Sequence, residues 1–251
     1  MDTHEGSQLN EIEPPPVRRA VTMLTLAHGW PDDVDRWLSG VLQHTTAHDF
    51  EALVVDNSGN AEVSHRLAGR RGERVRILAV QPPEGWADAA NRGLEAATGD
   101  VVVLFDPGVE LIGDVAGPLV DALSDPSVAA AGAYGVRGEG RIGHFHAHTG
   151  PEVDALEGYV LAFRRHGALE AGGFDRKFRF YRLADFELCF KLRDQVGGRG
   201  GRAVVVAGLP VERHQHRLWE ELSEEVRERR SRRNYHRFLE LWGKREDLIS
   251  G

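Results

Sequence analysis

With 251 residues, of which 41% are hydrophobic and 28% charged, the chain has the composition of a globular protein with a sizeable core. Its formal net charge of -8 argues against a nonspecific nucleic-acid binder, because such proteins carry an excess of Lys and Arg. The one cysteine, Cys189, excludes an internal disulfide framework and suits a reducing compartment, so we expect a cytoplasmic protein. No apolar run approaches the ~20 residues of a transmembrane helix, and the polar residues 1–13 do not resemble a signal peptide.

Short apolar strands alternate with amphipathic helices through the first half of the chain. The polar, proline-rich start predicts a disordered tail over residues 1–16, followed by a single domain over residues 17–251. The periodicity predicts strands at residues 21–26, 52–56, 75–80, 101–105 and 128–133, with helices at residues 33–44, 61–67, 88–97 and 115–123. Continuous apolar strands separated by helices indicate a parallel sheet covered on both faces.

The second half is less regular. Its glycine- and histidine-rich residues 135–150 predict a loop or hairpin. Beyond them we expect strands at residues 156–164 and 203–206, a helix at residues 184–195 and a polar helix at residues 218–242.

Polar residues follow two of the predicted strands, at the sheet edge where ligands bind in open parallel sheets. Asp56 is suited to accept hydrogen bonds from a nucleobase, and Asp106 to meet a ribose hydroxyl or a metal beside a diphosphate. The alternative is that both residues only make the turns that end strands. Residues 26–31 lack the glycine spacing of a dinucleotide-binding turn, and no phosphate loop of the G-x-x-x-x-G-K type is present.

Several motifs, taken in order, resemble family 2 glycosyltransferases of the GT-A fold, in their rhamnosyltransferase-like branch. In the first half they are VVDNS at residues 54–58, AANRGL at 89–94, ATGD at 97–100 and LFDP at 104–107. In the second half they are EGY at residues 157–159, RR at 164–165, GGFD at 172–175 and ADFEL at 184–188, followed by His214. The resemblance covers residues 17–243.

The resemblance implies an α/β GT-A fold with a mostly parallel central sheet flanked by helices and a C-terminal helix. Residues 17–134 would form the nucleotide-binding half and residues 135–251 the acceptor half. It implies inverting transfer of a hexosyl-type sugar from a nucleoside diphosphate sugar to a hydroxyl acceptor. These are expectations for the structure.

The resemblance also implies roles for particular residues. Asp56 would contact the base, Asp88 and Asn91 would line the donor, and Asp106 would stand at the diphosphate. The carboxylate matching Asp185 would be the general base, which an alcohol nucleophile needs. Alternatively, Asp185 is only a first-turn carboxylate that the helix dipole favours. The reserve candidate for the base is Glu187.

Three further residues complete the predicted site. Glu157 and Gly158 would lie on the acceptor side, as the resemblance implies. Trp86 lies beside the donor residues, where its ring either stacks on a base or sugar or belongs to the core.

Two positions depart from the family's pattern. Gly108 stands where the metal motif has its second carboxylate, and Ala184 stands where an acidic residue is common. A divalent cation, Mg²⁺ or Mn²⁺, is therefore in doubt, since both prefer oxygen ligands. Asp106 with His214 and the diphosphate, Glu110, or a basic side chain would each compensate. His216, two residues after His214, is a further candidate ligand, but we interpret it as a surface residue.

Two rival functions remain open. The departures at Gly108 and Ala184 also suit a catalytically inactive nucleotide-sugar-binding or scaffold protein of the same fold. A nucleotidyltransferase on a similar sheet is disfavoured by the acceptor-half motifs. Expected partners are a nucleotide sugar and a hydroxyl acceptor, without nucleic acid, and the Arg/Glu-rich C-terminal helix either covers the acceptor site or pairs with a second copy in a homo-oligomer.

Overall fold

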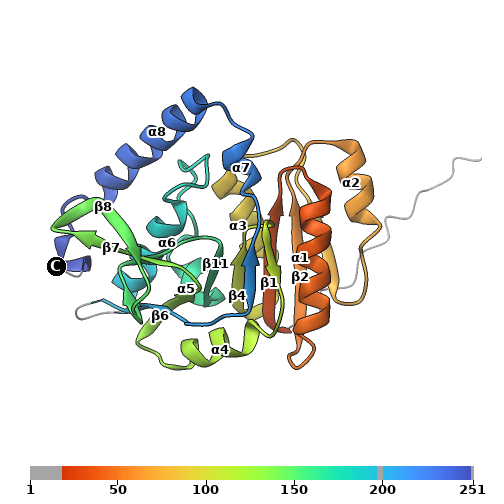
Figure 1. The fold of residues 1–251 in the computed structure, drawn as a ribbon, viewed down its shortest axis with the longest axis horizontal. Coiled ribbons are helices and arrows are strands. Elements are labelled where there is room, and N and C mark those ends of the chain that lie inside the picture. Colours follow the sequence, from red (N-terminus) through yellow and green to blue (C-terminus); the bar gives the residue numbers. More distant parts are fainter. Residues whose placement is uncertain (1–18, 197–199, 250–251) are drawn as a thin grey trace, which may run out of the picture.

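The computed structural model describes residues 19–196 and 200–249 (Figure 1). The predicted tail, residues 1–16, lies outside these described residues. Among the helices of the described part, none is both long enough and apolar enough to cross a membrane.

A large central sheet runs through the molecule with the strand order β3-β2-β1-β4-β11-β6-β12-β9. Four consecutive strands of the first half are parallel neighbours. They are β1 (Arg19–Ala27), β2 (Phe50–Asp56), β3 (Val75–Ala79) and β4 (Gly99–Phe105). Their carboxyl ends therefore meet at one edge, as the sequence predicts.

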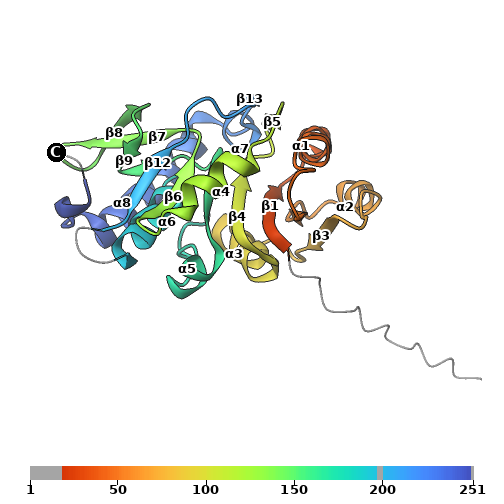
Figure 2. The same ribbon diagram turned by 90° about the horizontal axis from the view of Figure 1, so that it is seen from below.

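Helices cover both faces of this sheet because successive side chains of a strand point to opposite sides. Met23 of β1 packs in the cluster formed with α1 (Pro31–His44), α2 (Ala61–Ala68) and α4 (Ala116–Ser124). The next residue, Leu24, packs in the cluster with α3 (Trp86–Ala96) and α6 (Ala184–Gln195). Figure 2 shows α1 on one side of the sheet and α3 with α5 (Arg165–Glu170) on the other.

The second half extends the sheet and adds two small ones. β6 (Val128–Gly132), β9 (Glu152–Val153), β11 (Val160–Arg164) and β12 (Arg202–Val205) continue the main sheet, and β11 is antiparallel to both of its neighbours. β7 (Gly135–Glu139) and β8 (Arg141–His148) form the hairpin expected at residues 135–150, with β10 (Ala155–Leu156) beside β7. β5 (Val109–Leu111) pairs with β13 (Val211–Arg213).

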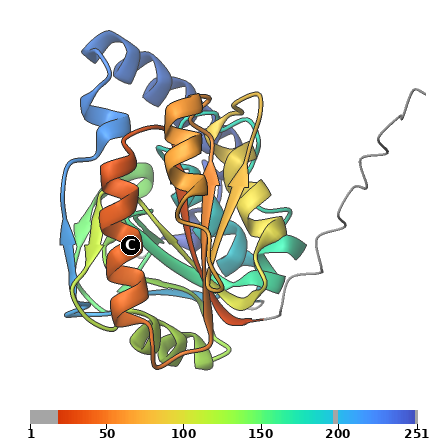
Figure 3. The ribbon, with the colours of Figure 1, turned by 90° about the vertical axis from the view of Figure 1, so that its right-hand side faces the viewer.

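Two predicted elements are divided in the structure. The strand expected at residues 156–164 is β10 and β11, and residues 157–159 turn between them. The polar helix expected at residues 218–242 is α7 (Arg217–Glu220) and α8 (Glu224–Trp242), separated at Ser223, whose hydroxyl accepts a hydrogen bond from the Val226 amide and caps α8. Figure 3 shows α7 and α8 at the same end of the sheet as α2.

Candidate active site

A cavity opens at the carboxyl edge of the parallel strands, where the two halves of the chain meet. Residues from the ends of β1 and β4, the 157–159 turn, the start of α6 and the segment before α7 line it. The polar or aromatic residues among them are Trp86, Phe105, Asp106, Glu157, Tyr159, Tyr181, Arg182, Asp185, Phe186 and His216. Five of the predicted site residues, Trp86, Asp106, Glu157, Gly158 and Asp185, thus come together here.

Asp185 is the most deeply buried carboxylate of this cavity, with 9% of its surface exposed. Its Oδ2 accepts a hydrogen bond of 2.7 Å from the Gly158 amide, and its Oδ1 one of 2.9 Å from the Phe186 amide. Burial raises the pKa of Asp185 to about 7; these two amides oppose the rise, and the carboxylate of Glu157 adds to it. The carboxyl group therefore changes charge near neutral pH.

The backbone around Asp185 explains its close approach to the 157–159 turn. α6 begins after Leu183, which has a left-handed φ of 63°, a conformation that non-glycine residues rarely adopt and that is found preferentially at functional sites. A Cβ at Gly158 would lie 3.3 Å from Asp185 Oδ2, closer than most real Cβ contacts. Glycine at this position therefore lets the carboxylate reach the backbone of the turn.

Asp106 lies across the same cavity and faces His216. The Oδ2 of Asp106 and the Nε2 of His216 are 3.3 Å apart, and each side chain is only 12% exposed. Burial raises the pKa of Asp106, while His216 opposes the rise. His216 is also stacked on Tyr181, with ring centroids 4.3 Å apart. The interpretation of His216 as a surface residue is therefore wrong, because its ring is packed between Asp106 and Tyr181.

Gly108 explains how His216 reaches this position. The Gly108 amide donates 2.8 Å to Asp106 Oδ1, and its carbonyl accepts 2.8 Å from the His214 amide. A Cβ at Gly108 would lie 2.5 Å from the carbonyl oxygen of Gln215. The chain segment that carries His216 thus fills the space that a side chain at position 108 would occupy.

Glu157 is the third acid of the cavity. Burial raises the pKa of the Glu157 carboxyl, and Arg213 and Arg182 oppose the rise. Arg213 itself lies over the ring of Tyr159, 4.1 Å from the centroid. The cavity therefore combines three carboxyl groups whose pKa values are raised by burial with one cation in its lining, Arg182, while Arg213 lies over the lining residue Tyr159.

The sequence of this chain matches the model described as Glycosyl transferase family 2 over residues 26–198, more than half of its length. The chain belongs to glycosyl transferase family 2. No curated protein matches it.

Two solved structures of similar fold agree with this membership. One is GalNAc-T7 with UDP, GalNAc and Mn²⁺, which matches 90% of this chain and 49% of its own with a TM-score of 0.69 and 17% identity. The other is mannosyltransferase PcManGT from Pyrobaculum calidifontis in complex with GDP-Man and Mn²⁺, with 78% and 56% coverage, a TM-score of 0.56 and 20% identity. At these identities the likeness establishes the GT-A fold, and this chain spans about half the length of either protein.

Within this family 2 chain, Asp56 and Asn91 are engaged with the chain's own groups. Asp56 accepts hydrogen bonds from the amide and hydroxyl of Ser58, at 3.1 and 2.6 Å, and from the hydroxyl of Ser64. The amide of Asn91 donates 2.9 Å to the carbonyl of Phe174 and accepts 2.8 Å from its N–H. Neither residue lines the cavity.

Asp88 and Glu187 likewise lie outside the cavity. Asp88 pairs at 3.0 Å with Arg176, which lies on the loop that precedes α6. Glu187 is fully buried beside Lys191, at 2.9 Å, and burial raises its pKa while Lys191 opposes the rise. Glu187 is therefore paired with Lys191 along α6 in the protein interior and does not line the cavity.

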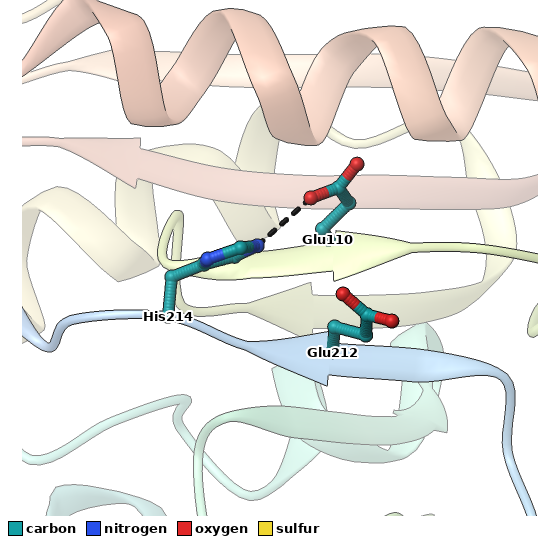
Figure 4. A group of neighbouring side chains, drawn as sticks. All are labelled: Glu110, Glu212 and His214. Carbon is teal, nitrogen blue, oxygen red and sulfur yellow. Dashed lines mark hydrogen bonds and ion pairs between the residues drawn. The ribbon is translucent and has the colours of Figure 1, made fainter.

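His214 belongs to a separate group beside the two-stranded sheet of β5 and β13. Its Nε2 lies 2.8 Å from Glu110 Oε2, and Glu212 stands opposite Glu110 in the β5–β13 pair (Figure 4). The ligand atoms of these three residues lie within 4.8 Å of one another.

His216 takes a different course because β13 ends at Arg213, so the regular alternation of a strand no longer governs the residues after it. His214 still lies beside β5, whereas His216, at the start of α7, faces Asp106. The sequence signal that points to His216 is only its position two residues after His214.

The contacts of Asn91 lead to a stability prediction. Replacing Asn91 with Ala leaves the buried N–H and carbonyl of Phe174 without partners, so we expect the free energy of unfolding to fall by about 2–4 kcal/mol. Glu95→Ala, at an exposed position of the same helix, should change it by less than about 0.5 kcal/mol. Urea denaturation measures both, and an unchanged stability of Asn91→Ala would contradict this structural role.

Proposed function

We propose that the protein transfers a glycosyl group from a nucleoside diphosphate sugar to a hydroxyl acceptor with inversion. The observation that carries the proposal is Asp185, a buried carboxylate with a pKa of about 7 in the cavity that also contains Asp106. A general base works best when its pKa lies near the working pH. Membership of the family and the GT-A fold support the same reaction.

In this reaction Asp185 takes the proton of the acceptor hydroxyl while the hydroxyl oxygen attacks the anomeric carbon. The bond from that carbon to the diphosphate oxygen breaks on the opposite side, so the configuration inverts and a nucleoside diphosphate leaves. The Gly158 and Phe186 amides hold the carboxylate in place through both of its oxygens. Glu157 and Arg182 at the rim are suited to position the acceptor.

Asp106 and His216 are the residues that fit a divalent cation in this cavity. They offer one carboxylate oxygen and one imidazole nitrogen 3.3 Å apart, and adjacent ligands of an octahedral ion with bonds of about 2.1 Å stand about 3 Å apart. The Nδ1 of His216 is buried and has no hydrogen-bond partner in the described part of the chain, so the ring is not committed elsewhere. A bound cation would neutralise charge on the leaving diphosphate. This assignment replaces His214 by His216 beside Asp106.

The nature of the donor is proposed from the comparisons and from Trp86. The two solved structures are complexes with UDP and with GDP-Man, which motivates a nucleotide sugar here. Trp86 stands at the cavity with its ring edge-on to Phe174, at a centroid distance of 5.2 Å, and is suited to contact the donor. A hexosyl-type sugar, of the rhamnosyltransferase-like branch, is part of the proposal.

Donor binding is tested by thermal unfolding with UDP, GDP, TDP and CDP and their sugars, each with Mn²⁺, Mg²⁺ or EDTA. A ligand at 100 times its Kd stabilises by about 2.7 kcal/mol, which for a chain of this size raises Tm by about 5–10 °C. We expect such a shift for one base, enlarged by the cation in the wild type and not in His216→Ala.

Two results would contradict the proposal in different ways. If no nucleotide raises Tm, the proposal that the protein binds a nucleotide sugar loses its basis. Binding without transfer or donor hydrolysis, across metals and acceptors, favours the inactive nucleotide-sugar-binding protein instead.

A further inference from the structure

A second groove adjoins the reaction cavity and is rich in arginine. It shares Trp86 and Leu218 with the cavity, and Arg179, Arg230 and Arg233 line it. Arg179 lies in the segment before α6, whereas the other two lie on α8, at the end of the molecule that also carries α7 (Figure 1). One bound molecule can therefore extend from the cavity into the groove.

Four arginines in the middle of α8 fall into two groups. Arg229 and Arg232 each pair with a glutamate one turn earlier, at 3.5 Å to Glu225 and in a short contact to Glu228. Arg230 and Arg233 are exposed, and neither forms an ion pair or a side-chain hydrogen bond within the described residues. The helix thus neutralises its outer arginines and leaves the two at the groove uncompensated.

Aromatic rings lie beneath one arginine of the groove and beneath two neighbouring arginines. The guanidinium of Arg230 lies over Phe180, 5.7 Å from the ring centroid. Arg182 and Arg227 both lie over Trp219, at 4.8 and 5.1 Å. A guanidinium on an aromatic ring keeps its N–H edges free to donate, and its fixed orientation reduces the entropy lost when it binds an anion.

Asn234 holds the two walls of the groove together. This buried residue of α8 donates hydrogen bonds of 2.7 Å to the carbonyls of both Phe180 and Arg182. α8 is thereby fastened to the segment that carries Arg179 and leads into Asp185. The hydrogen bonds of Asn234 therefore position the arginines of α8 relative to the cavity.

The remaining polar groups of the groove do not offset its positive charge. Glu84 is paired with Arg92 at 3.1 Å. Burial lowers the pKa of His28 to about 4, so its ring is neutral at pH 7. Its Nδ1 lies 3.4 Å from the donating amide nitrogen of Asn57, which leaves the proton on Nε2, a buried atom with no partner in the described part of the chain.

We propose that this groove binds a phosphoryl group of a substrate, either the diphosphate of the donor or a phosphate carried by the acceptor. Planar guanidinium groups match phosphate oxygens with paired hydrogen bonds. The chain has a formal net charge of -8, so the positive charge of the groove is not part of a general excess of basic residues. That the groove binds a phosphoryl group is argued from its own residues. The assignment of that group to the donor or to the acceptor rests on the proposed function.

The test is calorimetric titration of the full chain with inorganic pyrophosphate. We expect Arg230→Gln/Arg233→Gln to raise the pyrophosphate Kd at least tenfold. Arg229→Gln/Arg232→Gln, which removes the same charge from the same helix, should change it less than twofold. Arg179→Gln provides an independent variant on the other wall, and thermal unfolding checks that each variant folds.

Two further titrations identify the source. If the group belongs to the donor, the groove variant weakens binding of a nucleoside diphosphate and leaves the corresponding nucleoside unchanged. If it belongs to the acceptor, pyrophosphate still binds to protein saturated with nucleoside diphosphate, and the groove variant loses that binding. Absent pyrophosphate binding, or equal affinity in wild type, groove variant and control, would overturn the proposal. Pyrophosphate binding without glycosyl transfer would contradict the proposed function but would still support phosphoryl binding in the groove.

Discussion

Asp185→Asn is expected to lower the rate of glycosyl transfer by about 10²–10⁴-fold, the usual contribution of a general base, while nucleotide binding stays within twofold. The amide keeps the size of the carboxylate and the hydrogen bond from Gly158 but cannot take a proton. Because the base works in its charged form, wild-type turnover should rise with pH up to about 7 and then level off, following the pKa of Asp185. Steady-state kinetics with saturating donor from pH 5 to 9 measures both effects.

The same variant should be more stable than the wild type at alkaline pH. The folded chain holds the Asp185 proton more tightly than the unfolded chain, because burial raises the pKa of this carboxyl from 3.8 to about 7. Its contribution to stability is therefore complete below about pH 4 and is lost as pH rises through about 7. At pH 8 the neutral amide avoids that loss, which amounts to at most about 4 kcal/mol for a shift of about three pKa units.

Glu187→Gln is the matched control for the base, since Glu187 lies two residues along the same helix. Its carboxylate is buried beside Lys191 and does not line the cavity, so we expect kcat per folded molecule to be retained. If Asp185→Asn keeps its turnover and Glu187→Gln loses it, the base is misassigned. If both retain turnover with an unchanged pH profile, neither carboxylate is the base.

Gly108→Asp, which restores the second carboxylate of the family's metal motif, is expected to lower activity about 100-fold. The new Cβ would meet the Gln215 carbonyl at 2.5 Å and Asp106 Oδ1 at 2.9 Å, so the segment carrying His216 must move away. Such overpacking costs about 1–3 kcal/mol, and a second carboxylate beside buried Asp106 adds repulsion. Kinetics with Mn²⁺, together with urea denaturation, measures the two consequences.

Gly108→Ala separates the steric effect from the charge. It should reproduce the loss of stability and part of the loss of activity, because its methyl group already meets Gln215. A Gly108→Asp enzyme that gained activity in Mn²⁺ would mean that the chain lost its metal site through a single substitution. Such a gain would contradict the proposal that His216 is the metal ligand beside Asp106.

The order of strands and helices could be predicted because it depends on local periodicity. The apolar runs of β1, β2 and β4 and the helix pattern of α6 are each visible within about a dozen residues. Motif order was informative for the same reason, and it placed Asp106 and Asp185 in one site. Among the small elements that were missed, β5, β13 and α5 have three to six residues each, too few for a periodic pattern.

Contacts between distant segments could not be predicted in the same way. Asn91 carries the residue type of a donor site, yet its partner, Phe174, becomes a neighbour only when the chain folds. The choice between His214 and His216 has the same cause. Both follow one strand, and which of them meets Asp106 depends on where the 214–216 segment crosses Gly108.

The amino-acid order was thus sufficient for the parallel strands and helices of the first half and for the family, because these depend on patterns within single segments. Of the six carboxylates predicted for the site, only Asp106, Glu157 and Asp185 line the cavity. Only the tertiary structure decided which side chains share the cavity, what raises the pKa of Asp185, and which arginines of α8 lack a partner among the described residues. Burial and pairing are properties of the whole fold, since a carboxylate changes its proton affinity only when other segments exclude water from it. The arginines of α8 look alike in the sequence, and packing against the segment that leads into Asp185 makes two of them part of a groove.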